Sequence, residues 1–560
     1  MKISKPLIWT FIISIMITTF STQIFAASEK ELEYNPVEDS NFFMGLDEEG
    51  NIINMYTEDL EPEVAIGAPM ALNDEEDQFV AYDKSADKVL ETFDNQKDAD
   101  AYLATRKTDQ NIIVYNNNVT HNLNYGVVNF RIKGIRSNTN FIEEKTGFSR
   151  YTNGQYGADA VFLGYTNDGK VRFKLAGVVG VVEKDQVQLV EYSDTKIISK
   201  YYTVDDRIYH GIVNDINATK YASQQDVGVK PSYLQNGKNY YSYDGHYFYE
   251  TFHKMADDYK NGTYANAVNP KNPYYNYYQF LSHRSESSIT AEQIDKYFKD
   301  SNNTGEKSKL HGTGKALKEA EAKYGINALL IIGVAINESA WGNSRYAIER
   351  NNLFGHGAVD SNPDSAVKYA SSGDSIIAHA SKYLSDGYLD PCDWTVANDG
   401  YSNRCTGGRY NGGHLGDKRS GSNVMYASDP YWGEKAASQV NRIEKDGYTK
   451  EKREQIGVLL DSSNLNVRKE ADTKSTLLYR TRPGDSISFK ILGTVKGEMV
   501  EGSDVWYKIQ SDPVLDKTRS KLLQNTSTQI NEYDMKNMYG YIHASYVHII
   551  DKEIVPPTKP

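Results

Sequence analysis

The longest apolar stretch in the interior of the chain is ALLIIGVAIN, at residues 328–337. It is apolar on nearly every side and longer than an ordinary strand, so it predicts a buried helix. Glu338 follows directly, and we expect its carboxyl group to lie at the helix end, half out of the core. Because apolar walls disfavour a charged carboxylate, the pKa of Glu338 is expected to rise toward neutrality. A carboxyl group of this kind can donate a proton in a reaction.

Patterns with the period of a helix recur between residues 229 and 452. They cover the segments 289–301, 314–324, 374–385 and 432–445, which are separated by loops rich in Gly, Asn and Asp. The segment AVDSNPDS, at 358–365, predicts a turn or short hairpin among them. Helices around one short hairpin make an α+β domain with a cleft, and we expect residues 229–452 to form it.

Strand patterns mark two regions that flank the helical one. Strand segments separated by Asn and Gly turns recur at residues 125–192, and a second β-rich pattern follows residue 453. We expect small all-β modules, each a barrel or sandwich, at 123–228 and 453–552. Residues 79–122 combine the strand patterns FVAYD and NIIVYN with a helix-like stretch at 95–106. This combination predicts a small α/β segment.

The N-terminal residues have the pattern of an export signal. Lys2 and Lys5 precede the apolar stretch 7–20, and the small residues Ala26 and Ala27 follow it, which predicts a signal peptide at 1–27. Residues 28–78 are acidic and poorly periodic, and they predict a linker. No later segment approaches the roughly 18 apolar residues that a membrane span needs. We therefore expect export without membrane insertion, with a retained signal anchor as the alternative.

Composition and charge narrow the choice of partners and cofactors. The 560 residues include 62 basic and 75 acidic side chains, a formal net charge of −13. This length indicates several domains, and the acidic balance disfavours nucleic acid as a partner. The histidines show no metal-binding spacing and no glycine-rich phosphate loop occurs, so we expect no metal and no cofactor. The two cysteines, Cys392 and Cys405, could close a loop worth about 3 kcal/mol or remain free thiols.

Three blocks in the helical region occur in a family-specific order. AINESAWGNSRYA, NNLFGHGAVDSNP and GSNVMYASDPYWGEKAA resemble the lysozyme-like endo-β-N-acetylglucosaminidases that cut bacterial peptidoglycan. The resemblance implies a lysozyme-like α+β catalytic domain with Glu338 as its catalytic acid. At the C-terminal side, LNVRKEAD, the turn at Pro483, VWYKI and YGYIHASYV resemble bacterial SH3-like wall-binding modules, with an insertion at 511–538 that departs from them. Residues 125–192 resemble a more divergent member of that class.

The resemblance and the chemistry together give a set of candidate site residues. Glycoside hydrolysis normally needs a second carboxylate, for which we favour Asp360, with Asp364 and Asp374 as alternatives and a turn-forming role as the competing interpretation. The substrate's own N-acetyl group could replace that carboxylate. Tyr426 matches the family's cleft tyrosine. The remaining candidates, for substrate binding or for packing, are Asn352, Phe354, Tyr431 and Trp432.

The sequence therefore predicts a secreted, cell-wall-associated autolysin that acts as a monomer. Its expected substrate is the β-1,4 bond between N-acetylglucosamine and N-acetylmuramic acid, and its expected partners are peptidoglycan glycan strands and stem peptides. A lytic transglycosylase or a muramidase of the same fold is the alternative among enzymes. From a different class, a non-catalytic wall-binding protein is the other alternative.

Overall fold

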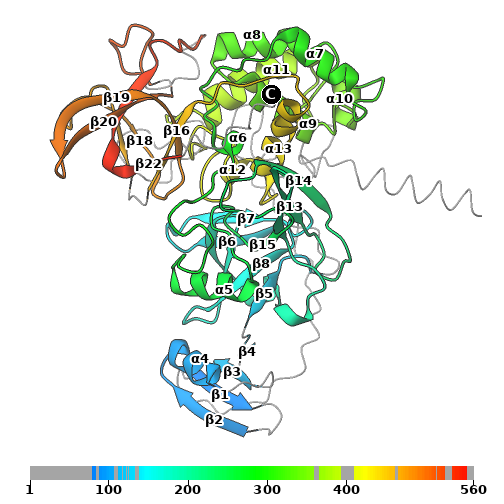
Figure 1. The fold of residues 1–560 in the computed structure, drawn as a ribbon, viewed down its shortest axis with the longest axis vertical. Coiled ribbons are helices and arrows are strands. Elements are labelled where there is room, and N and C mark those ends of the chain that lie inside the picture. Colours follow the sequence, from blue (N-terminus) through cyan, green and yellow to red (C-terminus); the bar gives the residue numbers. More distant parts are fainter. Residues whose placement is uncertain are drawn as a thin grey trace, which may run out of the picture.

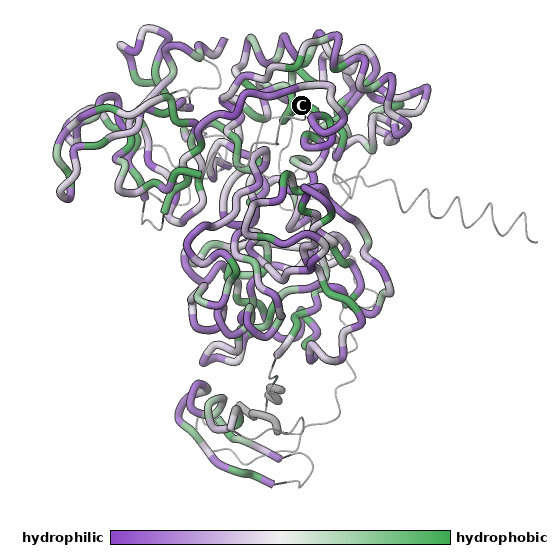
Figure 2. Tube along the Cα trace, in the orientation of Figure 1, coloured by the Kyte–Doolittle hydropathy of each residue, from purple (hydrophilic) through white to green (hydrophobic). Residues whose placement is uncertain are grey.

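The computed structural model describes the chain over several stretches, which are residues 79–83, 88–105, 111–115, 118–121, 123, 125–132, 138–357, 365–392, 409–460, 464–512, 514–523 and 532–550. It consists of four antiparallel sheets and one helical region (Figure 1). The expected signal peptide and acidic linker lie outside the described residues, as do Asp360, Asp364 and Cys405. Figure 2 shows hydrophilic residues along most outer turns and hydrophobic segments through the interior.

The helical region lies around α9 (Ala328–Glu338), which is the buried helix that the apolar pattern predicts. Asn327 caps its first turn, because its side chain accepts hydrogen bonds from the backbone N–H groups of Leu329 and Leu330. The predicted helices at 289–301, 314–324 and 432–445 are confirmed as α7, α8 and α13. The helical elements of this region are α6 (Tyr277–Phe280), α7 (Ala291–Asp300), α8 (Gly314–Tyr324), α9, α10 (Arg345–Arg350), α11 (Ser372–Ala378), η4 (His379–Tyr388), α12 (Asn423–Tyr426) and α13 (Trp432–Lys445). A further helix, α5 (Phe252–Asn261), lies outside this region and packs in the hydrophobic cluster of Val127 and Val161 (Figure 1).

The segment expected to form one helix at 374–385 is divided into two elements. An α-helix, α11, continues into η4, a ten-residue π-helix. π-Helices are rare, and those that occur are frequently found at functional sites. The hydrophobic spacing of the sequence does not distinguish the two helix types, because both keep apolar residues on one side.

A seven-stranded antiparallel sheet precedes the helical region, with the order β11-β5-β8-β9-β10-β6-β7. Its apolar face holds a core of valines and phenylalanines that includes Phe141, Phe162 and Phe173. The expected β character is confirmed, but the pairing of the described strands does not show a closed barrel. The strands are β5 (Gly126–Asn129), β6 (Thr139–Glu143), β7 (Ser149–Thr152), β8 (Asp159–Tyr165), β9 (Val171–Leu175), β10 (Val178–Val182) and β11 (Gln188–Glu191).

A second, four-stranded sheet crosses the domain boundary expected at residue 228. Its order is β14-β13-β12-β15, with β12 (Lys200–Val204), β13 (Arg207–Ile212), β14 (Ser223–Val229) and β15 (Asn239–Tyr240). β15 follows the boundary in sequence and pairs with β12. In Figure 1, β13 and β14 lie beside α13, and hydrogen bonds join the backbone of Asp226 to Ser438 and Asn441. This sheet therefore packs directly on the helical region.

The C-terminal sheet also shares its core with the helices. Its order is β18-β17-β21-β20-β19-β16-β22. Ile456 and Val458 of β16, and Ile550 directly after β22, belong to the hydrophobic cluster that surrounds α9. The guanidinium of Arg284 pairs with Asp512 at 3.3 Å, and both side chains are buried. The strands are β16 (Gln455–Leu459), β17 (Asn466–Arg468), β18 (Leu477–Arg480), β19 (Ser488–Val500), β20 (Ser503–Gln510), β21 (Tyr539–His543) and β22 (Val547–Ile549).

The first described strands form a small sheet of their own (Figure 1, blue). Its order is β2-β1-β3-β4, and α4 (Gln96–Ala104) packs on it through Ala99 and Leu103. The strands are β1 (Phe79–Asp83), β2 (Lys88–Phe93), β3 (Asn111–Tyr115) and β4 (Asn118–His121). Over the stretches that the structure describes, no helix has the length and apolar character needed to cross a membrane.

Candidate active site

Glu338 ends α9 and is buried rather than half exposed. Only 2% of the residue is accessible, which corrects the expectation from the sequence. The reason is Trp432, the first residue of α13, whose side chain covers the carboxyl group and donates a hydrogen bond from Nε1 to Oε1 at 2.5 Å. Oε2 is also buried and has no hydrogen-bond partner among the described residues. The two carboxyl oxygens therefore have different surroundings.

The surroundings of Glu338 favour its protonated form. Burial raises the pKa of the Glu338 carboxyl well above its ordinary value, the indole N–H of Trp432 lowers it, and the negative charge of Asp429 raises it further. Asp429 is itself fully buried and is paired with Lys435 at 2.5 Å. The structure thus agrees with the expectation from the sequence that the pKa of Glu338 is raised.

The turn after Glu338 has an unusual backbone. Ala340, Trp341 and Gly342 have successive positive φ angles of 47°, 60° and 76°, and such angles are uncommon for residues other than glycine. The Ser339 hydroxyl bridges this turn, since it donates to the Ala335 carbonyl and accepts from the Gly342 N–H. Strained turns of this kind cluster at functional sites. Ser339 therefore holds the end of α9 where Glu338 projects.

Aromatic rings form a wall beside the acid. The Tyr426 ring lies 4.2 Å from the Trp432 ring and nearly parallel to it, and both residues are buried. His379 of η4 approaches Tyr426 edge-on, and the Phe354 ring stacks on His379 at 3.8 Å with an interplanar angle of 2°. Burial first, and the charge of Glu338 second, raise the pKa of Tyr426 well above its ordinary value. The structure thus brings together Glu338, Tyr426 and Trp432.

The other predicted substrate contacts are engaged within the protein. The Asn352 side chain donates to the carbonyls of His356 and Val367 and accepts from the N–H groups of Phe354 and His356. Phe354 is fully buried in the hydrophobic core. These contacts favour a structural role for Asn352 and Phe354, and their substrate-binding role stays a prediction.

Tyr431 lies on the opposite side of α13 from Glu338. It belongs to the apolar cluster of the seven-stranded sheet, and its ring meets the His210 ring edge-on at 4.8 Å. This packing separates Tyr431 from the Glu338 site, whereas its neighbour Trp432 forms part of that site. A sugar-stacking role for Tyr431 therefore also stays a prediction.

The second carboxylate remains a prediction, because Asp360 lies outside the described residues. Of the two alternatives, Asp364 lies outside them as well, and Asp374 is exposed in the first turn of α11, where its carboxylate accepts from the Ser371 hydroxyl. Cys392 is buried and disulfide-bonded, in line with the loop considered from the sequence, and its expected partner Cys405 lies outside the described residues.

Sequence reasoning missed a buried lysine that holds the loop of Tyr426. Lys418 is fully buried and its ammonium group donates to the backbone carbonyls of Asn423 and Ala427, on either side of Tyr426. Burial lowers the pKa of Lys418 to about 7. The sequence pattern gives no sign that this lysine is buried, because its hydrogen-bond partners are backbone carbonyls rather than complementary side chains.

The described residues offer no metal-binding group of three or more His, Cys, Asp or Glu side chains. A neutral carboxyl group with one oxygen fixed by a donor and the other unengaged can transfer a proton from the unengaged oxygen. This is the function of a general acid.

The residues of this site lie in a stretch of the chain that matches a known family model. Residues 314–445 match the family model described as glucosaminidase, mannosyl-glycoprotein endo-beta-N-acetylglucosaminidase. Two curated relatives from two strains of Streptococcus pneumoniae, both assigned as endo-beta-N-acetylglucosaminidase, are 31% identical over 279 residues. That match covers 50% of this chain and 35% and 32% of the relatives, so the chain spans about a third of their length.

Solved structures of S. aureus Autolysin E also match in part. A catalytic mutant in complex with the disaccharide NAG-NAM is 20% identical over 32% of this chain and 77% of that chain, with a TM-score of 0.24. A complex with the muropeptide NAM-L-ALA-D-iGLU is 21% identical over 31% and 75% of the two chains, with a TM-score of 0.23. The family match is independent of these structures. The stretch that matches the glucosaminidase family model, residues 314–445, includes both Glu338 and Trp432.

Proposed function

We propose that the chain is a peptidoglycan hydrolase that cleaves the β-1,4 bond between N-acetylglucosamine and N-acetylmuramic acid. The observation that carries the proposal is the asymmetric environment of Glu338 inside the glucosaminidase region, with Oε1 held by Trp432 and Oε2 unengaged. Because Oε1 accepts the indole hydrogen bond, the proton of the neutral acid resides on Oε2. Oε2 then protonates the bridging oxygen as the glycosidic bond breaks.

The carboxylate left after proton transfer keeps a partner. Its Oε1 still accepts from the Trp432 N–H, and a hydrogen bond to a charged acceptor is stronger than one to a neutral acceptor. The Trp432 contact therefore stabilises the site more after the proton has left than before. For the positive charge at the anomeric carbon, we propose Asp360, with the substrate's N-acetyl group as the alternative.

A glycan strand must reach the buried acid for this reaction to occur. Glu338, Tyr426 and Trp432 are 2%, 0% and 1% accessible, so the proposal requires that the aromatic wall opens when substrate binds. The aromatic wall includes His379 of the π-helix η4, and π-helical segments are frequent at functional sites. We propose that binding energy from the strand drives this opening.

The test is a digestion of purified cell walls followed by analysis of the new ends. Reducing N-acetylglucosamine ends would support the proposal. Reducing N-acetylmuramic acid ends would indicate a muramidase, and anhydro-muramic ends a lytic transglycosylase. If the wild-type chain binds walls but releases no ends, the non-catalytic wall-binding alternative is correct.

The matched control for this digestion is Glu338→Gln. Glutamine keeps the shape of the side chain and an oxygen for the Trp432 hydrogen bond, and it removes the transferable proton. Loss of a general acid reduces turnover by about a hundred- to ten-thousandfold. Full activity in this variant would refute the role of Glu338.

We further propose that the protein is secreted and that the β16–β22 sheet contacts the cell wall. Tyr539 and Tyr541 share one face of β21, and the Lys508 ammonium lies 3.7 Å from the Tyr539 ring centre. Such an aromatic and cationic face can bind sugar rings and anionic groups. Deletion of the sheet would also remove Ile456 and Val458 from the helical core, so substitutions are the better test.

Wall binding can be measured by co-sedimentation of the inactive Glu338→Gln protein with insoluble walls. Adding Tyr541→Ser and Lys508→Gln is expected to weaken co-sedimentation. Adding Met499→Ser, at a residue 63% exposed on the same sheet, serves as the control and should leave it unchanged. If the protein with Tyr541→Ser and Lys508→Gln binds walls as well as the protein with Met499→Ser, the Tyr541 face is not the wall contact.

A further inference from the structure

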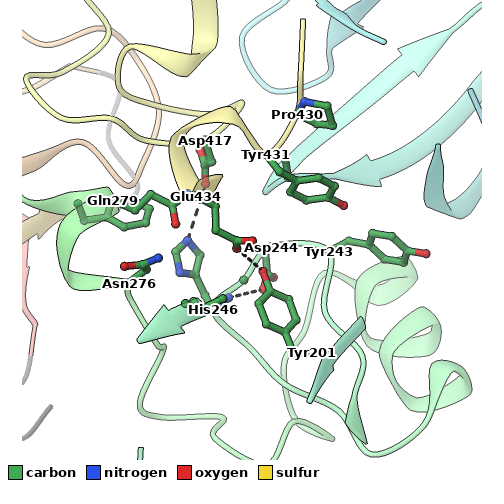
Figure 3. A pocket seen from close by; sticks show the side chains of 14 residues that line it. Tyr201, Tyr243, Asp244, His246, Asn276, Gln279, Asp417, Pro430, Tyr431 and Glu434 are labelled. Carbon is green, nitrogen blue, oxygen red and sulfur yellow. Dashed lines mark hydrogen bonds and ion pairs between the residues drawn. The ribbon is translucent and has the colours of Figure 1, made fainter. Parts of the chain in front are cut away.

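The first turn of α13 carries two side chains that point in opposite directions. Trp432 reaches Glu338, and Glu434 reaches the four-stranded sheet. The Glu434 carboxylate is buried, with Oε1 2.7 Å from Nδ1 of His210 and Oε2 accepting from the Tyr201 hydroxyl at 2.9 Å. Figure 3 shows Tyr201 and Glu434 facing one another from the sheet and from α13. The start of α13 is thus tied to β12 and β13.

The two groups that hold Glu434 are fixed by their own strands. Tyr201 and His210 are directly opposite one another in the β12–β13 pair, and their rings stack at 4.1 Å with an interplanar angle of 9°. Tyr431 meets His210 edge-on from the residue before Trp432. Both rings are buried, so their packing fixes the positions of the Tyr201 hydroxyl and of Nδ1 of His210, which hold Glu434.

Packing alone does not fix the Glu434 side chain. Glu434, Tyr201 and Tyr431 line a cavity of about 20 Å³, which has room for about one water molecule (Figure 3). A side chain beside such a space can move unless hydrogen bonds restrain it. The His210 and Tyr201 contacts therefore supply the restraint.

α13 uses separate faces for the sheet and for α9. Glu434, Ser438 and Asn441 follow one another at helical spacing, and all three bond to β12, β13 or β14. Ala436 and Val440 lie on the face that packs against Gly333 of α9. A shift of α13 toward or away from the sheet would therefore change the position of Trp432 relative to Glu338.

We propose that His210 and Tyr201 are positioning residues for the Glu338 reaction, acting through Glu434 and the first turn of α13 on Trp432. The expected change in kcat rests on the proposed function. The expected change in the position of Trp432 does not. Both residues lie outside the matched region 314–445. The proposal therefore extends the catalytic unit to the four-stranded sheet. Loss of their contacts frees Trp432, and the transferable proton is no longer confined to Oε2 of Glu338.

The first readout is the indole N–H signal of Trp432 in full-length protein labelled with ¹⁵N-tryptophan. Trp432→Phe assigns the signal, and Glu338→Ala gives its position when the hydrogen bond to Glu338 is lost. Glu434→Ala is expected to move the signal toward that position. Glu434→Gln should leave it near the wild-type position, because the amide oxygen can accept from Tyr201 and the amide N–H can donate to Nδ1 of His210 once its ring proton resides on Nε2.

The second readout is turnover of solubilised glycan strands. Glu434→Ala is expected to lower kcat by about ten- to a hundredfold with little change in KM, because misplacement of a catalytic group acts on the chemical step. Glu434→Gln should restore most of kcat. The control is Glu144→Ala, which breaks an exposed ion pair with Arg172 on the seven-stranded sheet and should change neither readout.

Tyr201→Phe removes a single hydroxyl group and covers the case in which Glu434→Ala does not fold. It is expected to move the indole signal in the same direction by a smaller amount. A wild-type indole signal in folded Glu434→Ala, or in Tyr201→Phe where Glu434→Ala does not fold, would overturn the proposal. If the wild-type chain releases no sugar ends, the proposed function fails, and the indole signal still decides the positioning role.

Discussion

Gly333 of α9 lies directly against the backbone of Ala436 of α13. A Cβ atom placed on Gly333 would come within 2.5 Å of the Ala436 carbonyl oxygen and 3.0 Å of Cγ2 of Val440. The missing side chain lets the two helices approach closely with opposite directions. As a result, the last residue of α9, Glu338, meets the first residue of α13, Trp432.

Gly333→Ala is expected to destabilise the protein. In an exposed helix, the replacement of glycine by alanine is favourable by about 1 kcal/mol. At Gly333 the added methyl group would force the helices apart, and overpacking of this kind costs about 1–3 kcal/mol. Thermal or denaturant unfolding measures the difference. Gly373→Ala in α11 is the matched control, because its Cβ would meet only the Ala316 methyl at 3.3 Å and the Ser371 hydroxyl at 3.5 Å. Equal stabilisation by both changes would contradict the close approach of α9 and α13.

Glu338 is expected to make the folded protein less stable as the pH rises. Its pKa is raised in the folded state, so folding binds the proton more tightly, and that contribution is complete below the ordinary value of 4.5 and is lost as the pH rises toward the folded pKa. Each unit of difference is worth about 1.4 kcal/mol. Glu338→Gln does not titrate and should therefore be more stable than wild type at neutral pH, by an amount that shrinks toward pH 4.5.

Unfolding curves of the two proteins across that pH range check this expectation. Glu349→Gln, which removes an exposed carboxyl group paired with Arg345, controls for the loss of one acidic side chain. A stability difference between wild type and Glu338→Gln that stays constant with pH would argue against a raised pKa.

The position of Glu338 could be predicted from sequence, whereas its burial could not. The apolar run at 328–337 defines α9 because a fully buried helix needs no polar face. What covers Glu338 is Trp432, almost a hundred residues later in the chain, and only the packing of α9 on α13 brings the two together. A local pattern contains no information about that distant contact.

The domain boundaries show the same limit. The strand patterns at 125–192 and after residue 453 agree with strands such as β8 and β16. They do not show that Glu434 of α13 binds Tyr201 and His210, or that Ile456 packs in the helical core. Alternation shows that a strand has an apolar face, but it does not show which element covers that face. Packing partners therefore have to come from the structure.

Trp432→Phe is expected to shift the pH dependence of turnover upward. The indole N–H lowers the pKa of Glu338, so its removal raises that pKa, and the acid stays protonated to higher pH. The fall in activity on the alkaline side should therefore occur at higher pH than in wild type. The maximal rate should also drop, because Oε1 loses the donor that orients it. An unchanged alkaline limb would show that Trp432 does not contact Glu338 during turnover.

Asp429→Asn should shift the same limb in the opposite direction. The negative charge of Asp429 raises the pKa of Glu338, so neutralising it lets Glu338 lose its proton at lower pH. Asparagine keeps the acceptor that receives the Tyr431 N–H at the start of α13. Measuring kcat/KM against pH for Asp429→Asn and Trp432→Phe in parallel tests both signs at once. Shifts in the same direction would contradict the electrostatic account of the site.

Cys392→Ser is expected to lower stability through loss of its disulfide bond. Cys392 is fully buried and packs in the hydrophobic cluster of the C-terminal sheet with Tyr410. The chain has two cysteines, and a bridge to Cys405 closes a short loop worth about 3 kcal/mol. Unfolding of wild type with and without reductant measures this contribution, and mass spectrometry after alkylation counts the free thiols. Cys405→Ser should show the same loss if that bond is responsible, and reductant should have no effect on either variant. A reductant effect that persists in Cys392→Ser would exclude the disulfide as its cause.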